Sequence, residues 1–169
     1  MKIVGAVVII IASYIIGYLR RSNMLLGEKI ISQLIHLIKE IKNSVEYGVG
    51  SLSEFFEKCA YRESYDKLTF INKACNSDEM NYSLSGALCA ALNDWEHVSL
   101  ITKDEMSVIR ALFENIGKDL SGNEISKLDF AAERLKAALD ARHELNSKRR
   151  GYYETIYVLA GIAVAILLI

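Results

Sequence analysis

Proline is absent from the 169-residue chain, and no segment alternates apolar and polar residues in the manner of a strand. Helical periodicity punctuated by capping residues recurs instead. Nucleotide-binding loops, zinc-protease motifs and nucleophile elbows are missing as well. The three histidines, His36, His97 and His143, have no second ligand at helical spacing. The sequence therefore predicts an all-α protein that is not an enzyme and holds no cofactor and no metal.

The net charge is only −1, but it is unevenly distributed. Residues 22–147 carry 14 Lys and Arg against 20 Asp and Glu, a net charge of −6. A net-acidic segment excludes nucleic acid as a partner, because backbone binding needs a basic patch. Apart from these and Lys2, the bases form two clusters that flank apolar runs, Arg20-Arg21 and Lys148-Arg149-Arg150.

Two long apolar runs stand near the ends of the chain. Ile3–Leu19 is 17 residues without a charge, and Tyr152–Ile169 is 18 residues. An 18-residue helix is about 27 Å long, close to the roughly 30 Å of a bilayer core. We predict two retained transmembrane helices that contact the lipid bilayer. The alternatives are a signal peptide for the first run, which lacks a cleavage site, and a buried hairpin of core helices.

The basic clusters also predict an orientation. Both lie on the side of their helix that faces the middle segment, so the positive-inside rule places residues 20–150 in the cytoplasm. The three cysteines, Cys59, Cys75 and Cys89, form no CxxC pair and agree with a reducing compartment. Small residues four apart, Ser13 with Gly17 and Gly161 with Ala165, let helices approach closely. They predict packing within one chain or, alternatively, a homo-oligomer.

The middle segment predicts an antiparallel helical bundle. Its first helix, within residues 27–48, should bury one stripe and end at Gly48 and Gly50. Capping boxes at Ser51/Glu54 and Thr102/Glu105 should open helices over 52–62 and 103–118. Further helices are predicted over 66–75 and 84–96, with a loop in "CNSDEMNYS". The first stripe comprises Ile30, Ile31, Leu34, Ile35, Ile38, Ile41 and Val45.

The last bundle helix should start near Asn123 and bury one face, and nothing breaks it before Arg150. Whether it continues into the terminal apolar helix, with Gly151 as a swivel, is left open. The predicted domains are a transmembrane helix (1–21), a cytoplasmic bundle (22–149) and a second transmembrane helix (150–169). The buried face comprises Ile125, Leu128, Ala131, Ala132, Leu135, Ala138 and Leu139.

The order and spacing of five stretches resemble the stage III sporulation protein AB family over nearly the whole chain. The stretches are "GAVVIIIASYIIGYLR", "LIHLIKEIKNSVEYGVGSLSEFFEKCA", "SLSGALCAALND", "LITKDEMSVIRALFENIG" and "YYETIYVLAGIAVAILLI". The resemblance implies a place in the mother-cell membrane around the forespore, in a secretion-like channel complex. It also implies a bundle similar to the F-type platform proteins of type II secretion.

The partners that the resemblance implies are a cytoplasmic secretion-type ATPase and the other membrane subunits. The expected function is a platform that couples this ATPase to the channel. A membrane-tethered adaptor unrelated to secretion is the alternative, and a membrane-bound enzyme is a third. Since the first and last bundle helices start at the membrane, their far ends should meet the ATPase. The candidate residues there are Glu46, Tyr47, Lys118, Asp119 and Asn123. Alternatively, the glycines at these ends only close loops.

Overall fold

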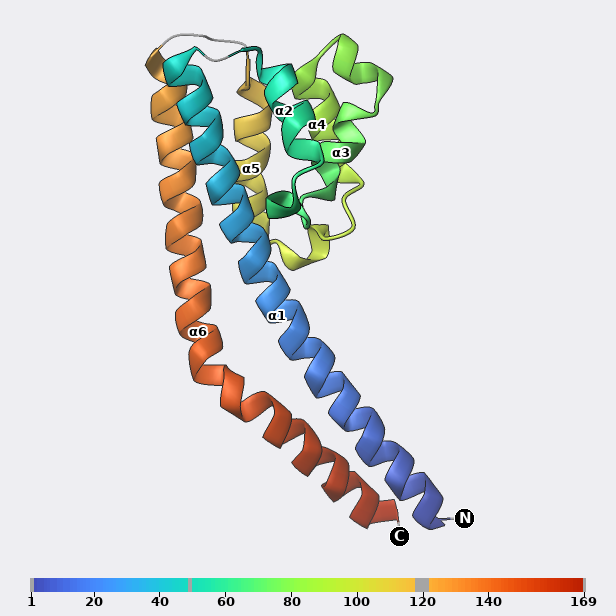
Figure 1. The fold of residues 1–169 in the computed structure, drawn as a ribbon. Helices are drawn as coiled ribbons and strands as arrows, with labels where there is room; N and C mark the ends of the chain where they lie inside the picture. The colour runs from blue at the N-terminus through green and yellow to red at the C-terminus, as the bar shows by residue number, and fades with distance from the viewer. Residues whose placement is uncertain (1, 49, 118–121, 169) are drawn as a thin grey trace. The chain divides into compact units, whose positions relative to one another are not determined.

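The computed structural model of the chain describes residues 2–48, 50–117 and 122–168, and the regular structure in these ranges is helical (Figure 1). This confirms the predicted all-α class. The elements are α1 (Lys2–Tyr47), α2 (Leu52–Ala60), the 3-10 helix η1 (Glu63–Tyr65), α3 (Thr69–Cys75), the 3-10 helix η2 (Asp78–Asn81), α4 (Leu84–Asn93), the 3-10 helix η3 (Val98–Leu100), α5 (Lys103–Asn115) and α6 (Gly122–Leu168).

The chain divides into two compact units. The terminal unit combines Met1–Glu28 with Asp140–Ile169, and the central unit is Lys29–Leu139. Helices α1 and α6 contribute to both units, because each runs without a break through a unit boundary. Helix α6 therefore continues past Gly151, the point that the sequence left open. The predicted domain boundaries after residues 21 and 149 concern the membrane and stay a prediction.

The core of the central unit contains the apolar stripes that the sequence predicted. On α1, the stripe from Ile30 to Ile41 is at most 8% exposed, and Val45 at its end is half-buried. On α6, Leu128, Ala131 and Leu135 are buried, while the other predicted positions are half-buried. Burial of these side chains is the main source of stability for the unit.

An aromatic cluster joins the shorter helices to this core. The ring of Phe70 lies 5.0 Å from that of Trp95 and 5.7 Å from that of Phe113. Phe113 is in turn 6.3 Å from Phe56, in an edge-on arrangement that aromatic pairs favour. Because these rings come from α2, α3, α5 and the segment just after α4, the cluster fixes the short helices against one another.

The structure shortens several helices that the sequence predicted. Helix α5 ends at Asn115 and not at Lys118, because Ile116 is extended and Gly117 has a φ of +76°. Helices α2 and α4 likewise end two or three residues early, and α3 begins at Thr69 and not at Asp66. The predicted loop "CNSDEMNYS" contains the 3-10 helix η2. Helical periodicity locates these elements, but local backbone geometry sets their ends.

Capping is the local feature that the sequence located best. At Thr102, the hydroxyl accepts a hydrogen bond from the Glu105 amide at 3.3 Å, and the Glu105 carboxylate accepts one from the Thr102 amide at 2.8 Å. Both halves of the predicted capping box are therefore present. At Ser51, the hydroxyl accepts a bond from the Glu54 amide at 3.2 Å. These bonds satisfy helix N-termini that would otherwise lack partners.

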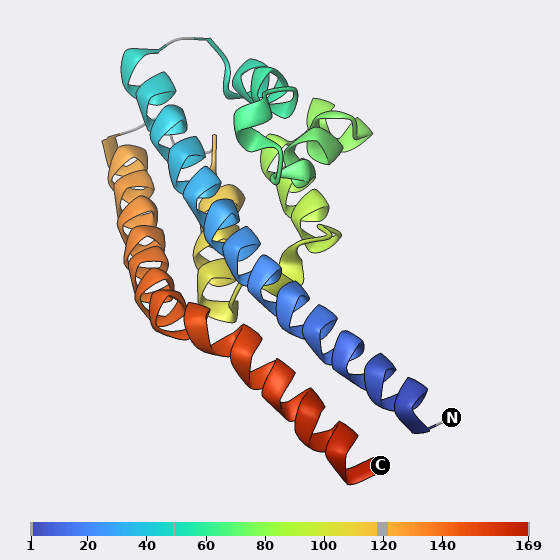
Figure 2. The same ribbon diagram turned by 60° about the horizontal axis from the view of Figure 1, so that its bottom comes forward.

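The terminal unit consists of two antiparallel helices that lie side by side, with the N- and C-termini at the same end (Figures 1 and 2). Gly17 marks a close approach, since a Cβ atom there would lie 3.3 Å from the Cβ of Tyr157. Many large apolar side chains of this unit are 39–69% exposed. They include Val7, Val8, Ile11, Tyr14, Ile15, Ile16, Tyr18, Leu19, Leu25, Leu145, Ile156, Leu159, Ile162, Val164 and Ile166.

The predicted transmembrane helices lack support from the described residues. In this part of the chain, no helix is both long enough and apolar enough to cross a membrane.

Candidate partner-binding surface

The turn between α1 and α2, described at residues 46–48 and 50–51, contains two glycines with positive φ values. Gly48 and Gly50 have φ values of +61° and +79°, a region that side chains with a Cβ rarely occupy. The Gly50 amide donates a hydrogen bond to the Gly48 carbonyl at 3.2 Å. Ser51 then caps α2. The two glycines and the Ser51 cap therefore let the chain leave α1 and enter α2 within a few residues.

Two of the predicted partner-binding residues lie at the start of this turn. The Tyr47 side chain projects from the last turn of α1 and is 77% exposed. Glu46 lies 3.7 Å from Lys42, which also bonds to both carboxylate oxygens of Asp129 at 2.8 Å. The bond to Asp129 raises the pKa of Lys42. Lys42 thus stays charged and links the last turns of α1 to α6.

A shallow hollow of about 360 Å³ lies beside Tyr47, between the end of α1 and α2. Phe55 and Lys58 of α2 line it, together with Glu40 and Arg62. Arg62 donates a hydrogen bond to Glu40 at 2.9 Å. The surface thus combines two aromatic rings with an ion pair, a composition typical of protein-binding sites.

A second hollow, of about 540 Å³, joins the α1–α2 turn to the end of α5. Gly48 and Gly50 line it from the turn, and Ile116 and Gly117 line it from the chain just after α5. The last described residue before position 118 therefore lies next to the turn. Of the other predicted partner residues, Lys118 and Asp119 lie outside the described residues. Asn123 falls in the first turn of α6, but its side chain is also outside the described part.

The predicted membrane-flanking residues lie on the two helices of the terminal unit. Arg20 is exposed and Arg21 half-buried on α1, and Lys148 of α6 pairs with Glu144 at 2.7 Å. The side chains of Arg149 and Arg150 lie outside the described residues. Two turns beyond Arg21, the Glu28 carboxylate accepts a hydrogen bond from Asn146 at 2.6 Å and contacts His143 at 3.3 Å. Polar contacts therefore join the two helices close to the basic clusters.

Two cysteines and one histidine of the central unit are potentially reactive, and each is at least partly buried or hydrogen-bonded. Burial raises the pKa of the Cys59 thiol to about 11, and burial also raises the pKa of Cys75. Both thiols are protonated at neutral pH and are poor nucleophiles. His36 shares a 2.8 Å hydrogen bond with the Tyr65 hydroxyl. Among the described residues, no three potential metal ligands cluster.

Sequence reasoning missed a polar cluster centred on Asp66. Its carboxylate accepts hydrogen bonds from Gln33 at 2.6 Å and from Lys29 at 2.9 Å. The side-chain oxygen of Gln33 accepts a hydrogen bond from the backbone amide of Lys67 at 3.1 Å. Gln33 is 8% exposed although it is polar. A glutamine next to the predicted apolar stripe was the available signal, since a buried polar side chain needs a partner.

The whole chain, residues 2–169, matches the family model described as stage III sporulation protein AB. No curated protein and no solved structure matches the chain. The match covers both helices of the terminal unit and all of the central unit. The protein therefore belongs to the stage III sporulation protein AB family.

Proposed function

We propose that the protein is a non-enzymatic platform subunit of a secretion-like channel complex, and that it couples a cytoplasmic ATPase to the membrane channel during endospore formation. The family implies a role in sporulation. The observation that supports the rest is the division of the chain into a terminal unit with outward apolar side chains and a folded central unit with an exposed turn.

Membrane attachment is the first part of the proposal. Apolar surface on this scale is usually covered by a membrane or a partner protein. Ile3–Leu19 contains no charge, and the basic clusters border both apolar runs. We propose that the two helices sit in the mother-cell membrane around the forespore and contact the other membrane subunits there. The basic clusters would then keep the central unit in the cytoplasm.

Contact with the ATPase is the second part. A motor in the cytoplasm needs an exposed surface on the central unit, and the α1–α2 turn offers one. Tyr47 is an exposed aromatic on a rigid helix, and the hollow beside it carries Phe55 and the Glu40–Arg62 pair. Aromatic and arginine side chains are the commonest anchors of protein interfaces. We therefore propose that the ATPase contact includes Glu46 and Tyr47 and, as the sequence predicts, Lys118, Asp119 and Asn123.

Charge reversal at this surface tests the proposal. The triple variant Glu46→Lys, Lys118→Glu and Asp119→Lys should fold and fractionate as the wild type does, because surface substitutions usually change stability by within ~0.5 kcal/mol each. It should lose co-purification with the proposed secretion-type ATPase and should block spore formation. The readouts are tandem affinity purification from sporulating cells and counts of heat-resistant spores.

A matched control makes the result specific. Glu63→Lys changes the net charge by the same amount as the triple variant, at an exposed position in η1. It should leave both ATPase capture and spore counts unchanged. Normal ATPase binding by the triple variant would contradict the surface assignment. Normal sporulation without any ATPase capture by the wild type would favour the adaptor function instead.

A further inference from the structure

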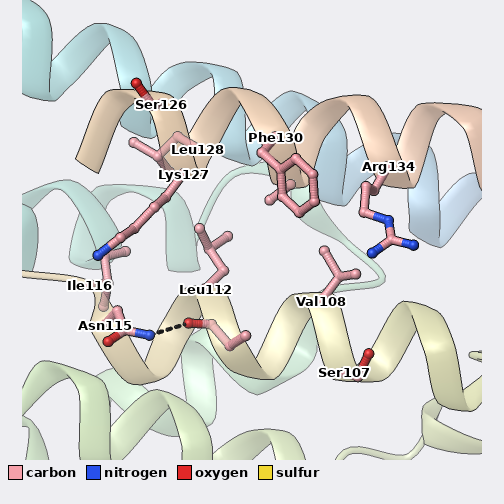
Figure 3. Close-up of a pocket in the computed structure, with 12 residues that line it drawn as sticks. Ser107, Val108, Leu112, Asn115, Ile116, Ser126, Lys127, Leu128, Phe130 and Arg134 are labelled. Atoms are coloured by element: carbon pink, nitrogen blue, oxygen red, sulfur yellow. Dashed lines mark hydrogen bonds between the residues drawn. The ribbon is translucent and has the colours of Figure 1, made fainter. Parts of the chain in front are cut away.

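A groove between α5 and α6 of the central unit is separate from the α1–α2 turn (Figure 3). Its volume is about 460 Å³, within the roughly 300–1,000 Å³ of typical binding sites. Leu112 of α5, Ile116 just after it and Leu128 of α6 line it and are nearly fully buried. Phe130 also lines it, yet its ring remains 59% exposed. The groove therefore extends the apolar core to the surface.

The charge of the groove differs from that of its surroundings. Among the described residues that line it, the charged ones are Lys127 and Arg134, both basic. They belong to a segment, residues 22–147, with 14 basic and 20 acidic residues and a net charge of −6. The Arg134 guanidinium lies 5.5 Å from the centre of the Phe130 ring, in a cation–π contact. A positive border on an apolar groove favours an occupant that is apolar on one face and acidic beside it.

The shape of the groove favours a helical occupant. Figure 3 shows Lys127 near one end, Arg134 near the other, and Phe130 and Val108 between them. Lys127 and Arg134 are seven positions apart on one helix, which corresponds to about 10 Å or two turns. Both walls are α-helices whose backbone groups are already paired, so an extended peptide would find no edge to extend. A helix laid along the groove needs no such edge.

We propose that this groove binds an amphipathic helix of another protein, which places apolar side chains beside Phe130 and acidic side chains against Lys127 and Arg134. This goes beyond the proposed ATPase contact and does not depend on it, because the two surfaces share no residue other than Ile116 at the hollow next to the turn.

A pair of designed peptides tests the proposal. Each has about 15 residues, or about 22 Å of helix, with three leucines on one face. The acidic peptide carries two glutamates seven positions apart beside the leucines, and its twin carries lysines there. Binding to the full-length chain in phosphatidylcholine nanodiscs is measured by fluorescence anisotropy, with empty nanodiscs as background. The acidic peptide should bind at least about tenfold more tightly than its twin.

Variants then locate the binding. Lys127→Glu with Arg134→Glu should reverse the preference between the two peptides. Phe130→Ala should weaken binding of the acidic peptide by about tenfold, because aromatic anchors contribute most of the binding energy in such contacts. Since Phe130 is largely exposed, this variant keeps the fold, which a thermal melt verifies. Tyr82→Ala is the matched control, because it removes an aromatic ring that is 90% exposed elsewhere on the same unit.

Three results would overturn the proposal. The first is equal binding of the two peptides, and the second is binding that survives both groove variants. The third is a different occupant. Self-association that Phe130→Ala abolishes would assign the groove to a second copy of the chain. Binding of oleate that Phe130→Ala abolishes, without binding of the acidic peptide, would assign it to a fatty acid.

Discussion

Helix α1 passes through both units, and its apolar residues behave differently in each. In the central unit, Ile30, Leu34 and Ile38 are at most 1% exposed. In the terminal unit, Ile11 and Ile15 of the same helix are 54% and 49% exposed. The residue type and the secondary structure are the same, so neither explains the difference. What differs is the number of neighbours: the central unit surrounds α1 with shorter helices, and the terminal unit offers α6 alone.

This contrast shows that the two units rely on different interactions. The central unit is stabilised by its own buried apolar surface and by the aromatic cluster. The terminal unit has a close approach at Gly17 and the polar contacts of Glu28. A pair of helices with so little mutual burial depends on whatever covers its outer faces. Substitutions of one kind should therefore have different consequences in the two units.

The largest effect is expected from an aspartate in the core of the central unit. Leu135 of α6 is fully buried, so Leu135→Asp would bury a charge without a partner. We expect a loss of about 4 kcal/mol or more, a large part of the roughly 5–15 kcal/mol that stabilises a domain. Circular dichroism of the purified full chain should show a lower melting temperature or no cooperative melt.

The same substitution at Leu159, on the same helix, provides the comparison. Leu159 is 59% exposed in the terminal unit. Leu159→Asp should leave the cooperative melt of the central unit unchanged and should reduce the membrane-bound fraction of the protein, since a charge in lipid costs free energy. A melt as damaged as that of Leu135→Asp would show that the two units are not energetically distinct.

The next effect concerns the Asp66 cluster of the central unit. Hydrogen bonds from Gln33 and Lys29 hold the pKa of Asp66 well below its usual value. The stability from this carboxylate is therefore fully present above the ordinary Asp pKa of about 3.9 and is lost as the pH falls toward the lowered folded-state pKa. In urea unfolding, Asp66→Asn should be less stable than the wild type by a constant amount at pH 6–8. That gap should narrow below about pH 4.

A control for this prediction is Asp94→Asn. Asp94 pairs with Lys73 at 3.0 Å but its side chain is 72% exposed. An exposed pair contributes little to stability, so Asp94→Asn should change the unfolding midpoint less than Asp66→Asn at every pH. Equal effects at pH 7 would mean that the bonds from Gln33 and Lys29 add nothing beyond an ordinary surface ion pair.

The sequence was informative where structure is local. The capping box at Thr102 and the glycines after α1 act within a few residues, so their pattern alone located helix ends. The sequence was uninformative where the partner is distant. Asp66 bonds to side chains 33 and 37 positions away, and no sequence pattern predicts a contact at such a separation.

Contacts between helices also could not be predicted from the sequence. Phe130 lies off the predicted buried face of α6, and it lines the α5–α6 groove together with residues of α5. The spacing of Phe130 in the sequence shows that it lies off the buried face of α6. The spacing could not show that α5 lies beside it. For the candidate partner site, the turn at Glu46 and Tyr47 was predictable from Gly48 and Gly50. The shape of the hollow beside this turn depends on how α2 packs, so it could not be predicted from the sequence.

A smaller effect is expected from the polar contact of the terminal unit. The Glu28 side chain is 16% exposed, and Asn146 donates to it at 2.6 Å. Asn146→Ala removes this donor and should cost about 1 kcal/mol, the usual net value of one hydrogen bond. Faster hydrogen exchange at residues 22–28 would measure it. Ser147→Ala is the control, because its hydroxyl bonds only to the Glu144 carbonyl within the helix, at 2.9 Å.

The smallest effect separates two glycines of α1 in the terminal unit. Alanine is favoured over glycine inside a helix by up to about 1 kcal/mol, and this gain applies equally to Gly5→Ala and Gly17→Ala. At Gly5, no atom lies within 4 Å of the added methyl group. At Gly17, the methyl group would lie 3.3 Å from the Cβ and 3.4 Å from the Cδ2 of Tyr157, which is tighter than ordinary packing.

The two helices must therefore give slightly at Gly17, and Gly17→Ala should gain a few tenths of a kcal/mol less than Gly5→Ala. Hydrogen exchange of α1 in detergent, compared between the variants, measures the difference. Tyr157→Ala should remove it in a double-mutant cycle, because the crowding belongs to that pair. Equal gains at both glycines would mean that the helices of the terminal unit are not held together at Gly17. Contacts between the outward apolar faces and their surroundings would then be the main interaction that stabilises this unit.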